Sequence, residues 1–144
     1  MRDVFARMYE WFGLMPLYSH DMSEFLKGMD TSCMSYFALP AYFYIGLAMI
    51  IVTGLIFALQ YDLISSARFP KREHWELAAM VVFITNFLIA FSVPYVAILI
   101  RSYCILLKLT VLDCIMFGLS NAIWALIFFA ILNTVWRILT QKRP

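Results

Sequence analysis

The sequence predicts an all-α integral membrane protein with three membrane-crossing helices, and three uncharged apolar stretches are the main reason. These stretches cover residues 36–59, 77–100 and 114–136, which are 24, 24 and 23 residues long. At about 1.5 Å per residue in a helix, each reaches roughly 35 Å, enough to cross a hydrocarbon core of about 30 Å. The composition points the same way, because 64% of the 144 residues are hydrophobic and only 14% are charged. Soluble domains have roughly 45–50% and about 25%.

The chain divides into an N-terminal segment, residues 1–33, and a polytopic transmembrane domain, residues 34–144. Residues 2–15 place apolar side chains three and four positions apart, which is typical of an amphipathic helix. We expect this helix to lie in the membrane interface, because it is too short to span. The alternative is that it packs on the membrane helices. Asp21 and Glu24 have the spacing of a capping box, which predicts a second short helix that begins at Asp21.

The segment 101–113 decides the number of crossings, because it is apolar but carries three charges. Residues 101–136 as one helix would be about 54 Å long, too long for a single crossing. The chain must therefore break within this region. One solution is an interfacial hairpin between two long spans, and the alternative is a fourth crossing over residues 95–112. Charge counting favours three crossings.

The distribution of basic residues predicts the orientation. With three crossings, the loop at 61–76 and the C-terminal tail lie on the same side of the membrane. The basic residues of that side are Arg68, Lys71, Arg72, Arg137, Lys142 and Arg143. The other side has Lys27, Arg101 and Lys108 near the spans. The positive-inside rule then predicts a plasma (inner) membrane protein with its C-terminus in the cytoplasm and its N-terminus outside.

Small and polar residues inside the apolar stretches predict helix–helix contacts. The expected contact residues are Gly54, Ala58, Asn86, Gly118, Asn121 and Ala122. Four of these form Gly/Ala pairs spaced four apart, which lets two helices approach closely. The two asparagines need partners because lipid offers none, and we favour an interhelical hydrogen bond over a pore-lining role. Three tryptophans are expected to anchor the chain at the membrane interface: Trp11, Trp75 and Trp136.

Three cysteines are present, Cys33, Cys104 and Cys114, and no CxxC motif occurs. The odd number argues against a disulfide framework. We expect buried thiols that act as small hydrophobic groups, with a Cys104–Cys114 bridge as the alternative.

No motif for catalysis, for a metal or for a cofactor is found in the sequence. Asp113 is the one carboxylate at the edge of a span, and we expect it to face the lipid headgroups. The predicted function is therefore non-enzymatic: a small multi-pass subunit or anchor of a larger membrane complex. The expected partners are the lipid bilayer and other membrane subunits or further copies of the chain, with no nucleic acid. The alternative is a homo-oligomeric pore or membrane-disrupting effector lined by Asn86 and Asn121.

Overall fold

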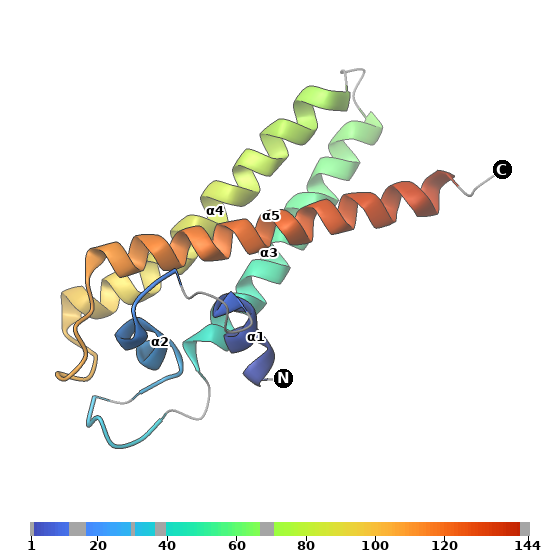
Figure 1. The fold of residues 1–144 in the computed structure, drawn as a ribbon. Helices are drawn as coiled ribbons and strands as arrows, with labels where there is room; N and C mark the ends of the chain where they lie inside the picture. The colour runs from blue at the N-terminus through green and yellow to red at the C-terminus, as the bar shows by residue number, and fades with distance from the viewer. Residues whose placement is uncertain (1, 12–16, 30, 37–39, 67–70, 142–144) are drawn as a thin grey trace.

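The computed structural model describes residues 2–11, 17–29, 31–36, 40–66 and 71–141, and helices dominate this part of the chain (Figure 1). In chain order the helices are α1 (Arg2–Tyr9), α2 (His20–Leu26), α3 (Ala41–Ser66), α4 (Lys71–Ile100) and α5 (Val111–Gln141).

Helices α3, α4 and α5 are each long and apolar enough to cross a membrane. Their candidate spans are Ala41–Gln60, Trp75–Ile100 and Val111–Leu139, with 20, 26 and 29 residues. In an apolar 18-residue stretch of each helix, only 28%, 28% and 39% of the residues are buried inside the chain, so most of their apolar side chains face outward. Water is a poor solvent for such a surface and lipid is a good one. The expectation of three long apolar helices is confirmed.

The connection between α4 and α5, residues 101–110, contains no helix. The alternative fourth crossing over 95–112 is therefore not formed. The backbone N–H of Ser102 donates to the carbonyl of Ala97 at 3.1 Å, as in a Schellman motif. Arg101 adopts the left-handed conformation, with φ 52°, that usually falls to glycine at this position. Backbone geometry thus ends α4 although the sequence remains apolar.

Helix α5 begins with a reciprocal capping box. The backbone N–H of Asp113 donates to Thr110 Oγ1, and the backbone N–H of Thr110 donates to Asp113 Oδ2, both at 3.2 Å. The other carboxylate oxygen of Asp113 accepts the backbone N–H of Ser19 at 2.9 Å. Asp113 is only 9% exposed, so the expectation that it faces the headgroups is wrong. It caps α5 and ties the start of α2 to it.

Helix α1 is shorter than the helix predicted over residues 2–15. It ends at Tyr9, and the part of the prediction beyond residue 11 lies outside the described residues. Tyr9 is fully buried. The ring of Phe5 occupies the space beside Gly46 of α3, where an added Cβ would overlap a ring carbon. Helix α1 therefore packs on the membrane helices, as the alternative proposed.

Helix α2 begins at His20 and not at Asp21. Its N-cap is Ser19, whose hydroxyl accepts the backbone N–H of Met22 at 3.3 Å. Asp21 has a different partner, because its Oδ2 accepts the backbone N–H of Lys108 at 2.9 Å. The predicted cap is therefore one of the residues that fasten α2 to the α4–α5 connection.

The short helices gather at one end of the long ones. In Figure 1, α1 and α2 lie beside the start of α3 and near the α4–α5 connection, while α5 crosses the pair formed by α3 and α4. A first core cluster lies at this end and contains Tyr9, Tyr18, Met22, Leu26, Tyr42, Ile45, Ala90, Cys114 and Phe117. A second core cluster joins α3, α4 and α5 and contains Met49, Ala78, Val82, Ala125 and Phe129.

The substitution Gly118→Leu tests the close approach of α4 and α5. A Cβ at Gly118 would lie 3.0 Å from two ring carbons of Phe87 and 3.2 Å from its backbone oxygen, so a leucine must push the two helices apart. We expect the free energy of unfolding in mild detergent to fall by about 1–3 kcal/mol. Gly54→Leu is the matched control, because a Cβ there meets nothing within 4 Å. An equal loss in both variants would contradict the close approach.

Candidate functional site

A chain of hydrogen bonds between fully buried polar side chains runs through the bundle. The hydroxyl of Tyr9 donates to Asn121 Oδ1 at 2.5 Å. Asn121 Nδ2 donates to the backbone oxygen of Asn86 at 2.8 Å. Asn86 Nδ2 in turn donates to Thr53 Oγ1 at 3.2 Å. All four side chains are 0% exposed. Because they come from α1, α5, α4 and α3, the chain of bonds connects four of the helices.

This network gives both asparagine amide nitrogens a partner within the chain, while Asn86 Oδ1 is buried with no hydrogen-bond partner among the described residues. Both amides bond to a neighbouring helix of the same chain, and Asn86 Nδ2 also donates to the carbonyl of Val82 at 2.9 Å. Lipid cannot replace these bonds. Separating the helices would therefore leave the amide groups without hydrogen-bond partners, which is unfavourable in free energy. In the single chain, neither amide faces outward.

The other predicted contact residues fall into two groups. Gly118 faces Phe87 of α4, and Ala122, on the same side of α5, is fully buried. Gly54 has open space around it, and Ala58 is exposed. The first pair therefore lies inside the chain. A helix contact at Gly54 and Ala58 remains a prediction for a partner.

The predicted tryptophan anchors also differ from one another. Trp75 and Trp136 are 40% and 37% exposed. They lie near the start of α4 and the end of α5, and so at the same end of the bundle (Figure 1). Trp11 is half-buried, and its ring packs against that of Trp124 with 5.3 Å between the centroids. Trp11 thus packs within the chain, and anchoring by the other two remains a prediction.

A polar cluster holds the N-terminal segment together. Lys27 Nζ lies 3.2 Å from Glu10 Oε1 and 3.2 Å from Glu24 Oε1. The hydroxyl of Ser23 donates to Glu10 Oε1 at 2.6 Å, and that of Tyr36 donates to Glu24 Oε2 at 2.7 Å. The bond from Tyr36 lowers the pKa of Glu24. Burial lowers the pKa of Lys27, but its bonds to Glu24 and Glu10 outweigh burial and raise it. Glu24 and Lys27 are therefore both charged near neutral pH.

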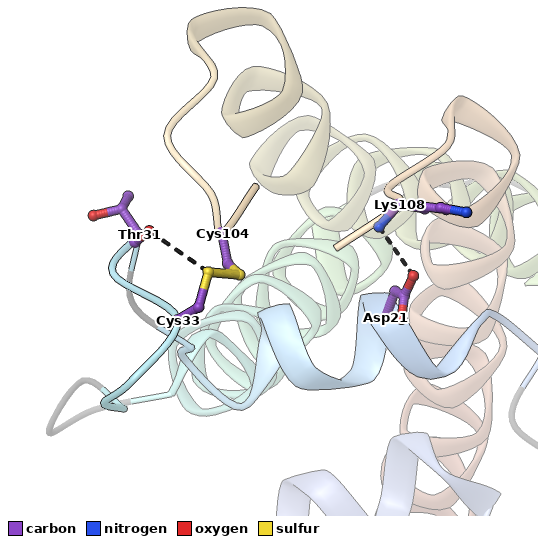
Figure 2. Close-up of a disulfide and its surroundings, with 5 residues drawn as sticks. All are labelled: Asp21, Thr31, Cys33, Cys104 and Lys108. Atoms are coloured by element: carbon purple, nitrogen blue, oxygen red, sulfur yellow. Dashed lines mark hydrogen bonds between the residues drawn. A yellow bond between two sulfur atoms is a disulfide. The ribbon is translucent and has the colours of Figure 1, made fainter. Parts of the chain in front are cut away.

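Cys33 and Cys104 form a disulfide, with 5.3 Å between their Cα atoms and a sequence separation of 71. The expectation of free thiols is wrong for these two residues, and so is the alternative Cys104–Cys114 bridge. Cys114 is a free, buried thiol. Figure 2 shows the bond between the Asp21 carboxylate and the backbone of Lys108 near the disulfide. One covalent and one polar tie thus fasten the N-terminal segment to the α4–α5 connection.

Sequence reasoning missed two of these features for physical reasons. Tyr9 lies among the apolar residues of the predicted amphipathic helix, so nothing in the spacing marks its hydroxyl as a donor to α5. The pairing of Cys33 with Cys104 depends on the folded approach of two distant loops. Within the described ranges, no three His, Cys, Asp or Glu side chains lie together in a way that could hold a metal ion.

No family model matches the chain, and neither a curated protein nor a solved structure matches it. The argument for a function therefore starts from the geometry above.

A double-mutant cycle on Asn86 and Thr53 tests the bond between α3 and α4. We expect Asn86→Leu to destabilise the protein in mild detergent, with a coupling energy to Thr53→Val of about 0.6–2 kcal/mol. Thr53→Val keeps the shape of the side chain and removes only the oxygen that accepts the bond. Strictly additive effects of the two substitutions would show that the bond contributes nothing.

Proposed function

We propose that the protein is a non-enzymatic, multi-pass subunit or anchor of a larger membrane complex. The observation that carries this proposal is the exposed end of α5. Phe129 is 1% exposed, whereas every residue from 134 to 139 is exposed. The apolar members of this segment are Val135, Trp136, Ile138 and Leu139, with exposed fractions of 48%, 37%, 51% and 59%. Because α5, with 31 residues, is longer than a hydrocarbon core of about 30 Å is thick, lipid alone does not cover all of this surface, and a partner subunit supplies the remaining neighbours.

The course of α5 supports the same interpretation. Helix α5 has 31 residues and is therefore about 46 Å long, well beyond a hydrocarbon core of about 30 Å. In Figure 1 its last part diverges from α3 and α4. The rings of Trp136 and Phe57 still meet, with 6.3 Å between their centroids. Beyond this contact, a helix of another subunit has room to pack against α5.

The pore alternative receives less support from the same structure. A pore built from several copies needs polar groups that face outward from each copy. The amide groups of Asn86 and Asn121 instead donate hydrogen bonds to α3 and α4. Opening a polar path through them requires breaking bonds that stabilise the chain.

We propose further that the N-terminus lies outside and the C-terminus in the cytoplasm. The disulfide joins the segment before α3 to the α4–α5 connection, so both of its cysteines lie on one side of a three-span protein. Disulfides persist in oxidising compartments, which supports an outer position for that side. Basic residues at the other end agree with this orientation, although Arg68, Lys142 and Arg143 lie outside the described residues.

The orientation predicts which introduced cysteines a membrane-impermeant maleimide can reach in intact cells. Ser66→Cys and Gln141→Cys should be protected, because both lie in the cytoplasm. His20→Cys, an exposed position on the outer side, should be labelled and serves as control. The native cysteines do not interfere, since two are bonded and Cys114 is buried. Labelling at only one of positions 66 and 141 would rule out three crossings, and labelling at both would reverse the orientation.

The subunit role predicts an effect of polar substitutions at the end of α5. Ile138→Ser combined with Leu139→Ser should release partners, so the native mass of the complex extracted in mild detergent should fall. Val93→Ser combined with Val96→Ser is the matched control on α4, where the exposed fractions are 40% and 48%.

Two outcomes would contradict the subunit role. The first is a wild-type protein that is extracted from its native membrane as a lone monomer. The second is a complex made of this chain alone that shows reproducible single-channel conductance in planar bilayers, which would favour the pore.

A further inference from the structure

We propose that the disulfide builds an apolar tip that inserts into the lipid interface of the outer leaflet. The tip consists of Met34, Ile105 and Leu106, with exposed fractions of 93%, 93% and 76%. Each of these residues follows Cys33 or Cys104 by one or two positions. The bridge therefore brings together very exposed apolar side chains that are about 70 residues apart in sequence. The inference rests on the membrane placement proposed above.

The tip lies between two helix ends that also carry exposed apolar side chains. At the end of α4, Leu99 and Ile100 are 64% and 66% exposed, and at the start of α5, Val111 and Leu112 are 49% and 61% exposed. Only the connection 101–110 lies between these pairs. Exposed apolar side chains on both helix ends and on the connection between them fit lipid better than water.

The charges beside the tip fit a lipid headgroup. Arg101 and Lys108 are exposed on either side of Ile105 and Leu106, and among the described residues neither cation forms an ion pair. Asp21 lies close to Lys108 but uses its carboxylate to accept the backbone N–H. Basic side chains next to apolar ones extend toward lipid phosphates while their stems cover apolar surface. Tyr36, which is 57% exposed, is also of a residue type enriched at this depth.

The disulfide has a physical role in this arrangement. Cys104 is buried, with an exposed fraction of 1%, while the residue that follows it is almost fully exposed. Because its Cα lies 5.3 Å from that of Cys33, the two loops cannot separate. Ordering both loops before they meet the membrane removes part of the entropic cost of insertion.

Fluorescence quenching in vesicles tests the tip. The full-length protein, with dansylalanine in place of Leu106, is reconstituted into phosphatidylcholine vesicles that contain phosphatidylglycerol. We expect blue-shifted emission that is lost when the lipids carry a nitroxide near the top of the acyl chain, and that resists iodide in the outer solution. The same label in place of His20, which is exposed on α2, should be quenched by iodide. Opening the disulfide with a reductant should raise the quenching of the Leu106 label by iodide.

A third label separates failure of the tip from failure of the membrane placement. Dansylalanine in place of Ile84, which is 50% exposed on α4, should be quenched by a nitroxide deep in the acyl chain. If this label behaves so while position 106 is quenched by iodide as strongly as position 20, the tip is overturned and the spans stand. If the Ile84 label is quenched by iodide, the membrane placement fails. Quenching at position 106 that is unchanged by the reductant would overturn the role of the bridge.

Discussion

The rest of the structure depends on one constraint: a polar group between apolar helices must find its partner inside the protein. Asn121 meets this constraint twice, because it accepts from Tyr9 of α1 and donates to the backbone of α4. The second bond requires α4 and α5 to lie close together. Gly118, one turn before Asn121, allows this approach because Phe87 fills the place of its missing side chain. The glycine and the amide therefore act together, and neither would hold the helices in this position alone.

Different forces hold the end where the short helices gather. Helices α1 and α2 have 8 and 7 residues, too few to be stable alone in water. Carboxylates fix α2 by linking it to distant segments, since Asp21 accepts the backbone N–H of Lys108 and Asp113 accepts that of Ser19. Helix α1 is held instead by the bond from Tyr9 to Asn121. The disulfide adds a covalent tie that closes a long loop, which restricts the unfolded chain. Packing of rings and aliphatic side chains against α3 and α5 then completes this end.

The sequence predicts well the features that depend on composition, such as long apolar helices. It predicts poorly the features that depend on single residues or on how one helix is aligned with another. Three long helices follow from three uncharged stretches, because hydropathy is a sum over many residues. Helix ends depend on single caps, and the spacing of Asp21 and Glu24 matched a capping box although Ser19 makes the cap. The end of α4 at Arg101 carries no glycine signal at all. Asn86 could be recognised as a residue that needs a partner, but which oxygen it bonds to depends on how α3 and α4 are aligned.

The two ends of the molecule thus differ in how many of their apolar side chains are covered by contacts within the chain. At the disulfide end, the described side chains form bonds between α1, α2, α5 and the loops, and the first core cluster is closed by aromatic rings. At the other end, burial stops near Phe129, and α5 continues with exposed apolar residues beyond it. Cross-links between distant segments are therefore concentrated at the disulfide end, while the last part of α5 presents exposed apolar side chains. On the subunit function proposed above, the cross-linked end fixes the position of the chain, and the exposed end of α5 is the surface on which a helix of another subunit packs.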